Sequence, residues 1–192
     1  MRADALTGGF ADAPREAAIG FRAVMQAMAR PGTIHRLGGA KPPLPLSVAA
    51  GVVLLTLCDP ETPIFLGDSV KNQDVTSWIS FHAGSPIVSP AAAMFALGRW
   101  DDFRQLHAFP IGSAEYPDRS ASVIIEMDEL GVTGEGSCRL TGPGIKDHSS
   151  LCLPDPATFQ SNSALFPLGL DFILTAGDCV AALPRSTKIE VL

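Results

Sequence analysis

FPLGLDFILTAGDCVAALPRSTKIEVL, residues Phe166–Leu192, carries the strongest structural signal in the sequence. Two short apolar runs, Leu170–Thr175 and Cys179–Leu183, flank a turn at Gly177-Asp178. Apolar runs joined by a glycine-containing turn predict an antiparallel hairpin. Because both runs are almost continuously apolar rather than alternating, both faces of the sheet that contains them should be covered. We therefore expect the rest of the chain to pack on both sides of this hairpin.

The N-terminal region predicts a flexible arm followed by an amphipathic helix. Residues 1–11 are small and polar enough to form a frayed arm. Asp12 can cap the helix, and Pro31-Gly32 ends it because the residue before a proline avoids the α region. A stripe of apolar residues at helical spacing is expected to face the core, namely Ala18, Phe21, Val24, Met25 and Met28.

Expected helices and strands alternate through the middle of the chain, which predicts an α/β fold. Ser47 can cap a second helix at 48–57, which is apolar on every side and should be buried. Further helices are expected at 72–83 and 155–165, and strands at 33–37, 63–66, 93–97, 122–127, 137–141 and 150–153. At 192 residues the chain should form a single domain. We expect a three-layer α/β/α sandwich around a mostly buried sheet.

The composition excludes several classes of protein. A net charge of −6 without any basic run argues against a nucleic-acid partner. The longest apolar run, Val48–Cys58, is about half the ~20 residues of a membrane span, and the N-terminus lacks a signal-peptide pattern. The cysteines lie far apart and the histidines lack metal-ligand spacing, so neither a disulfide scaffold nor a metal site is expected. A soluble, cytoplasmic protein is the expectation.

The low charge content leaves two interpretations of the surface. Charged residues make up 18% of the chain, against a usual ~25%. This favours either extensive protein–protein contact or a compact domain with a neutral surface. On the first interpretation, an apolar patch would be covered in a two-fold homodimer.

Two segments are candidates for binding an anion. Gly142-Pro143-Gly144 follows an expected strand, and backbone amides in such a loop can hold a phosphate, although Pro143 removes one amide. A tight turn is the alternative. Arg185, Ser186 and Thr187 leave the hairpin beside Lys188, and an arginine fork suits phosphate or phosphonate oxygens. The alternative is an ordinary chain exit with solvated charges.

Asp171 is a third candidate because it lies inside the most apolar strand. A buried carboxylate needs a partner or a raised pKa. It is therefore either a hydrogen-bond anchor for the fold or the acid of a ligand site.

Five segments in order along the chain form a recognisable set. The first four are FRAVMQAMARPG (Phe21–Gly32), LLTLCDPETPIFL (Leu54–Leu66), FHAGSPIV (Phe81–Val88) and RLTGPGI (Arg139–Ile145). The fifth is the C-terminal stretch, with its FPLG opening and LPRSTKIEV ending. Together they resemble the PhnH family, the H subunit of the bacterial carbon–phosphorus lyase core complex. The family keeps an arginine at the position of Arg185. Where it has threonine next, this chain has Ser186, which retains a hydroxyl.

The resemblance implies a homodimer that associates with the G, I and J subunits. It also implies a part in the step that displaces adenine from ATP to give a ribose 1-phosphonate 5-triphosphate. The implied sheet core is related to pyridoxal-phosphate transferases but lacks the cofactor. Nothing in the sequence assigns a catalytic residue, so an accessory, non-catalytic subunit is expected. An anion- or nucleotide-binding module with its own transferase step is the alternative.

The lysines agree with the expectation that no cofactor is bound. Pyridoxal-phosphate chemistry needs a lysine that forms a Schiff base. All four lysines lie in segments expected to be loops or chain ends: Lys41, Lys71, Lys146 and Lys188.

Overall fold

The predicted C-terminal hairpin is formed by β7 (Asp171–Ala176) and β8 (Cys179–Leu183) in a computed structural model that describes residues 6–192. The two strands pair antiparallel, with Ile173 opposite Ala182. Gly177 makes the turn with a φ of +56°, in the left-handed region that glycine adopts without steric cost. The hairpin is confirmed as predicted.

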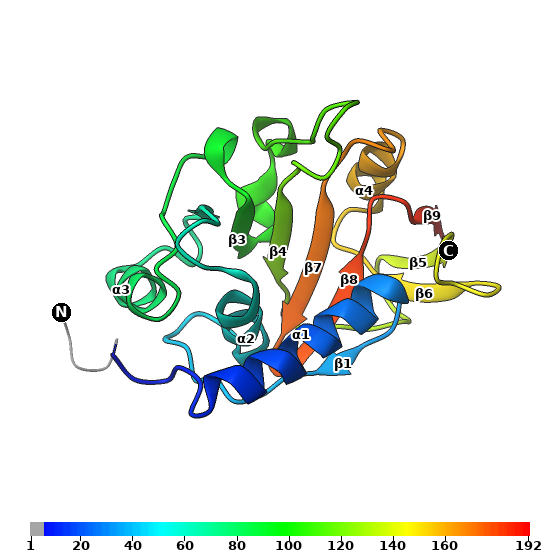
Figure 1. Ribbon diagram of the computed structural model, residues 1–192. Helices are drawn as coiled ribbons and strands as arrows, with labels where there is room; N and C mark the ends of the chain where they lie inside the picture. The colour runs from blue at the N-terminus through cyan, green and yellow to red at the C-terminus, as the bar shows by residue number, and fades with distance from the viewer. Residues whose placement is uncertain (1–5) are drawn as a thin grey trace.

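The hairpin lies within a six-stranded mixed sheet (Figure 1), in the order β1-β8-β7-β4-β3-β2. β7, β4, β3 and β2 run parallel to one another, while β8 pairs antiparallel with both β7 and β1. Three further strands form a separate antiparallel sheet in the order β6-β5-β9. The strands are β1 (His35–Arg36), β2 (Ile64–Leu66), β3 (Phe95–Arg99), β4 (Ser122–Glu126), β5 (Ser137–Thr141), β6 (Ser149–Cys152) and β9 (Lys188–Val191).

Four α-helices and three short 3-10 helices complete the described fold of residues 6–192. The α-helices are α1 (Ala13–Ala29), α2 (Val48–Leu57), α3 (Gln73–His82) and α4 (Pro156–Ser163). The 3-10 helices are η2 (Pro90–Ala92), η3 (Trp100–Phe103) and η4 (Leu106–Ala108). Within these residues no helix has both the length and the apolar character needed to cross a membrane.

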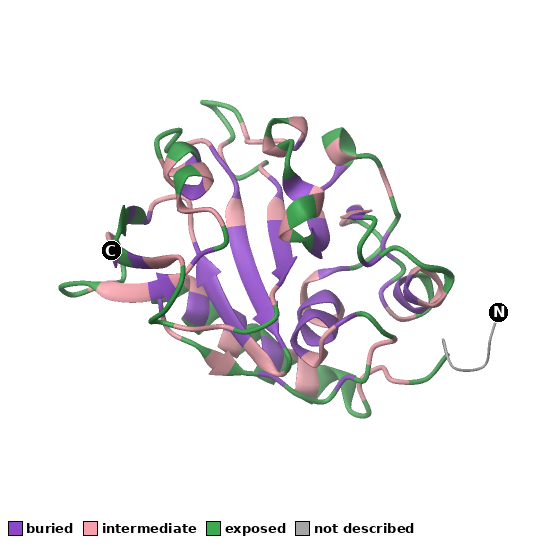
Figure 2. Cartoon of the chain, turned by 180° about the vertical axis from the view of Figure 1, so that it is seen from behind, coloured by how far each residue is buried: buried purple, intermediate pink, exposed green. Residues whose placement is uncertain are grey.

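Both faces of the main sheet are buried, as the apolar runs predicted (Figure 2). Successive residues of a strand point to opposite faces. Accordingly, Ile124 and Ile173 belong to one apolar core, while Ile125 and Leu174 belong to another on the other face. Fully burying side chains of this size stabilises the fold by about 1.5–3 kcal/mol each.

The first face is covered by α1, α2 and α3. Figure 1 shows α1 crossing in front of the hairpin. Ser47 begins α2 as predicted, with its side chain accepting a hydrogen bond from the Ala50 backbone N–H at 3.0 Å. α3 begins at Gln73, within the expected range 72–83, and the Asn72 side chain caps it by accepting a hydrogen bond from the Val75 backbone N–H at 2.9 Å.

The second face differs from the expected helical layer. It is covered by α4, by the 3-10 segments and by the second sheet. Phe159 of α4 stacks on Trp100 and meets Phe172 of β7 edge to face, with ring centroids 4.9 and 4.6 Å apart. The mixed α/β class is confirmed. However, strands β5 and β6 lie outside the main sheet, and the sequence did not predict β9, which pairs with β5.

The prediction for the inward face of α1 is wrong in part. Gly20, Val24 and Ala27 are the buried residues, whereas Phe21 and Met25 are each 50% exposed. Gly20 allows α2 to approach closely, since a Cβ there would lie 2.7 Å from Thr56 Oγ1. The helix is therefore rotated so that small residues face the core and larger apolar ones face solvent.

Part of the expected N-terminal arm is held on the fold. The Thr7 carbonyl accepts a hydrogen bond from Trp78 Nε1 at 3.1 Å, and the Gly8 carbonyl accepts one from the Lys41 backbone N–H at 2.7 Å. Phe10 packs against the first core. The expectation of a frayed arm does not hold for residues 7–10, and residues 1–5 lie outside the described residues.

Glu126 joins the end of β4 to the start of α2. Its carboxylate accepts hydrogen bonds from the Ser47 backbone N–H at 2.6 Å and from the Thr175 hydroxyl at 3.1 Å. Burial raises the pKa of Glu126, although these hydrogen bonds and the nearby Arg99 act to lower it. The folded state therefore binds the proton of Glu126 more tightly than the unfolded state does.

We expect Glu126→Gln to change how stability depends on pH. Because the folded pKa is raised, the contribution of Glu126 to stability is greatest below its usual pKa of 4.5 and falls as pH rises through the folded value. Glutamine does not ionise, so the variant does not lose this contribution as the pH rises. Its free energy of unfolding relative to that of the wild type should therefore increase with pH above about 4.5. Urea unfolding of both proteins across this pH range measures their free energies of unfolding. A difference between them that stays constant with pH would contradict this prediction.

Candidate functional site

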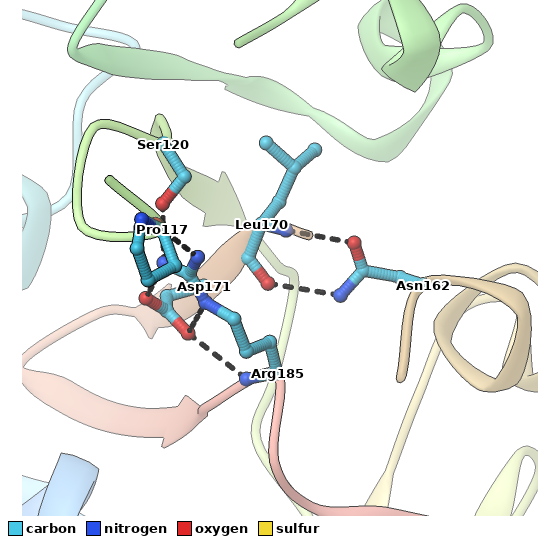
Figure 3. Close-up of polar contacts among 6 residues, drawn as sticks. All are labelled: Pro117, Ser120, Asn162, Leu170, Asp171 and Arg185. Atoms are coloured by element: carbon cyan, nitrogen blue, oxygen red, sulfur yellow. Dashed lines mark hydrogen bonds and ion pairs between the residues drawn. The ribbon is translucent and has the colours of Figure 1, made fainter. Parts of the chain in front are cut away.

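Two of the predicted site residues, Asp171 and Arg185, form an ion pair at the open end of the hairpin (Figure 3). Asp171 Oδ1 accepts hydrogen bonds from the Arg185 backbone N–H at 2.9 Å and from Nε at 3.1 Å. Asp171 Oδ2 accepts a further bond from Nη2. The two side chains are only 20% and 13% exposed, so solvent screens this pair less than a surface pair. Arg185 is therefore not a solvated charge of the chain exit, which was one of the two interpretations of the sequence.

The same guanidinium also attaches the loop that precedes β4. Arg185 Nη1 donates to the Pro117 carbonyl at 2.8 Å, and Nη2 donates to the Ser120 hydroxyl. One N–H of Nε, one of Nη1 and two of Nη2 are thus engaged, which is four of the five N–H donors of an arginine. We call Asp171, Arg185, Pro117 and Ser120 the arginine clamp.

A second polar contact fixes the residue before the clamp. The buried Asn162 side chain of α4 accepts from the Leu170 backbone N–H at 2.8 Å and donates to the Leu170 carbonyl at 2.9 Å. This pairing satisfies both halves of the amide. The backbone entering β7 is therefore held from one side by α4 and from the other by the clamp.

The remaining predicted residues lie close to the clamp. Thr141 pairs with Lys188, so the glycine loop follows β5 directly beside Ser186 and Thr187. A Cβ on Gly142 would lie 3.1 Å from the Ser186 carbonyl, and one on Gly144 would lie 1.9 Å from the Ala29 carbonyl. Both glycines have positive φ, at +132° and +81°. The loop thus packs tightly between the hairpin exit and the end of α1.

Thr187 is almost fully buried, and its hydroxyl has no hydrogen-bond partner among the described residues. A buried hydroxyl left unpaired costs about 1–3 kcal/mol. The side chain is enclosed by the fold, so it is not placed to bind a solvent ligand.

A groove of about 600 Å³ lies between α1 and the clamp. Its lining is mainly apolar and comes from the last turns of α1, the 166–167 turn and the hairpin exit: Met25, Met28, Ala29, Phe166, Pro167 and Pro184. Asp118, Asp171, Arg185 and Ser186 contribute its polar atoms. Gly142, Gly144 and Thr187 do not line the groove. Three of the six predicted site residues therefore meet in one groove, and the other three lie beside it.

The groove suits an apolar partner better than an anion. Most donors of Arg185 are used within the chain, and the carboxylates of Asp118 and Asp171 would repel a negative ligand. All four lysines of the chain are exposed, away from the lining of the groove. Across residues 6–192, no cluster of three or more His, Cys, Asp or Glu side chains is arranged to hold a metal ion.

The cysteines do not supply a nucleophile at this site. Burial raises the pKa of Cys58 to about 12, and burial is also the main cause of the raised pKa of Cys179. A thiol whose pKa is raised carries little thiolate at neutral pH, which makes it a poor nucleophile.

Sequence reasoning missed the loop residues of the site. Pro117 and Ser120 join the clamp through contacts with Arg185, more than sixty positions further along the chain. Phe166 and Pro167 were recognised only as part of the resemblance, yet they form one wall of the groove. The low charge content was the one signal that pointed to an exposed apolar surface.

We expect Arg185→Ala to destabilise the fold by about 2–3 kcal/mol, because it leaves Asp171 largely buried with only the Arg185 backbone N–H as a remaining partner. Arg185→Lys should recover part of this loss, since a point charge cannot reproduce the forked geometry. Urea unfolding measures both variants.

The matched control is Arg36→Ala, which breaks the exposed pair between Arg36 and Asp178, with side chains 82% and 46% exposed. This change should cost no more than about 0.5 kcal/mol. Equal effects of the two alanine substitutions would contradict the structural role of the clamp.

Known proteins resemble the chain over almost its whole length. It is 41% identical to the alpha-D-ribose 1-methylphosphonate 5-triphosphate synthase subunit PhnH of Rhizobium meliloti (strain 1021), over 96% of this chain and 95% of that protein. It is 36% identical to the putative C-P lyase subunit protein HtxG of Stutzerimonas stutzeri, over 95% of each chain.

The profile described as "Bacterial phosphonate metabolism protein (PhnH)" matches residues 8–190. This range includes α1, the glycine loop, the clamp and the groove. The chain therefore belongs to the PhnH family of bacterial phosphonate metabolism proteins.

Proposed function

We propose that this protein is the H subunit of a carbon–phosphorus lyase core complex and acts in the breakdown of organophosphonates. Its role is accessory to the step that joins ATP and a phosphonate into a ribose 1-phosphonate 5-triphosphate. The full-length similarity to one subunit of a synthase and to one putative lyase subunit supports this proposal. The G, I and J subunits are the proposed partners.

One observation carries the accessory role: the charged residues beside the groove bind one another, while large apolar side chains face solvent. Asp171 and Arg185 satisfy each other and the loop at Pro117. Met25 and Phe166 are 50% and 61% exposed on the lining of the groove. A preformed and mainly apolar surface favours protein–protein association over phosphate chemistry.

Three finer features belong to the same proposal. The isolated protein is a cytoplasmic two-fold homodimer before it joins the complex. Its main sheet is related to that of pyridoxal-phosphate transferases, in a three-layer arrangement in which the second sheet and α4 form one outer layer. It uses no pyridoxal phosphate, because each lysine lies on the surface rather than in a pocket where a Schiff base could be enclosed.

A second candidate is an anion- or nucleotide-binding module with its own transferase step. The observation that favours it is the position of Gly142 and Gly144 next to Ser186, with the exposed Lys188 opposite Thr141. It ranks lower because Pro143 removes an amide from the loop and both glycines pack against neighbouring backbone.

Deletion of the gene in its native host should abolish growth on a phosphonate as the sole phosphorus source and leave growth on phosphate unchanged. Re-expression of the tagged protein should restore growth. Its purification should recover the other subunits in fixed ratio, identified by mass. Normal growth of the deletion strain on phosphonate would refute the proposed function. Restored growth without stable partners would favour the independent module.

A further inference from the structure

We infer that a pocket between η4 and α4 binds an uncharged, mainly apolar small molecule that carries one hydroxyl group. The pocket has a volume of about 330 Å³, and within residues 6–192 it shares no lining residue with the groove beside α1. Small-molecule sites in proteins have volumes of roughly 300–1,000 Å³ and a mainly apolar lining with a few polar groups. Binding at this site does not depend on assembly with other subunits.

The pocket has a buried floor and an open mouth. Its most buried lining residues are Leu170 and Asn162, which are 1% and 7% exposed and bond to each other through the Asn162 amide (Figure 3). Leu106 and Ile111 add half-buried apolar walls, and Leu165, 47% exposed, lies at the mouth. A ligand can therefore bury apolar surface on a floor that is already fixed, which lowers the cost of ordering the site.

The lining carries no full charge. Among the described residues that line the pocket there is no lysine, arginine, aspartate or glutamate. The groove beside α1 differs, because Asp118, Asp171 and Arg185 all line it. Moving a charged ligand from water into an apolar site without an opposite charge is costly. The chemistry of the lining therefore selects an uncharged occupant.

The polar side chains of the lining define the polar group of the ligand. The Thr158 hydroxyl donates its proton to Asp155 Oδ2 at 2.7 Å. The Ser161 hydroxyl donates its proton to the Ala157 carbonyl at 2.9 Å. Both oxygens can still accept a hydrogen bond, but neither has a second proton to donate. The exposed His107 ring makes no hydrogen bond within residues 6–192, so in either tautomer it keeps an N–H to donate. A ligand hydroxyl, which both donates and accepts, matches these acceptors on α4 and this donor on η4.

A side chain inserted by a partner protein is the alternative occupant. Of the exposed residues in the lining, His107 and Ser161 are polar and Leu165 is the one apolar residue. A stable protein interface covers about 800 Å² on each partner, and this rim offers little apolar surface for one. A small molecule that enters the pocket is therefore the better match.

Cyclohexanol is a suitable probe, because it is uncharged, aliphatic and carries one hydroxyl. Added to the full-length protein with labelled methyl groups, it should shift the methyl resonances of Leu106, Ile111, Leu165 and Leu170 in a saturable titration. Cyclohexanecarboxylate and cyclohexylammonium carry a charge on the same ring, so they should bind at least about tenfold more weakly. Equal affinity for the three compounds, or shifts that do not saturate, would overturn the inference.

Leu165→Asp tests the location of the site, because it replaces an apolar residue at the mouth with a charged one. The matched control is Leu44→Asp, since Leu44 is 85% exposed and does not line the pocket. Both residues are exposed, so both variants should unfold at nearly the wild-type temperature. Leu165→Asp should weaken cyclohexanol binding by at least about tenfold, and Leu44→Asp should leave it unchanged. Equal binding by the two variants would place the ligand elsewhere and contradict the inference.

The same titration on the protein purified with its partner subunits distinguishes the two occupants. Cyclohexanol should bind this complex with the affinity that it has for the free protein. Loss of binding in the complex, with the pocket methyl resonances already shifted by the partners, would identify a partner side chain as the occupant and refute the small-molecule site.

Discussion

The ion pair between Asp171 and Arg185 connects parts of the chain that the two sheets alone would leave separate. It joins the first residue of β7 to the chain just beyond β8, closing the open end of the hairpin. Through Pro117 it also holds the loop before β4. From Arg185 the chain continues into β9, which pairs with β5 in the second sheet. This ion pair thus helps to fix the main sheet, the second sheet and the wall of the groove in position relative to one another.

The charged groups of the arginine clamp hold the chain in place rather than bind or react with a ligand. The Arg185 guanidinium donates hydrogen bonds to a carboxylate, a carbonyl and a hydroxyl, and these bonds fix its position. Removing its charge from water costs free energy, which these bonds offset. Little of its hydrogen-bonding capacity remains for a phosphate. Groove residues such as Met25 and Phe166, by contrast, leave apolar area in water that only another macromolecule would cover.

Local patterns predicted the elements that depend on local sequence. The hairpin and α2 follow from continuous apolar runs with a glycine turn and a serine cap, and both were found at the expected residues. β9 was missed because Lys188–Val191 forms a strand only through long-range pairing with β5. The orientation of α1 was predicted wrongly because Phe21 and Met25 have the spacing of a core stripe. Close packing at Gly20 selects a different face. Asp171 and Arg185 were named from sequence, but their pairing and its link to Pro117 depend on the tertiary fold.

Hydrogen exchange of the protein, free and assembled with its partner subunits, tests the docking of a partner in the groove most directly. Exchange slows where binding suppresses local opening of the backbone. We expect added protection at residues 21–29, 165–168 and 184–186, which surround the groove, and unchanged exchange in α3 on another part of the surface. Protection gained in α3, with α1 and the hairpin exit unaffected, would contradict the assignment of the groove as the surface that binds the complex.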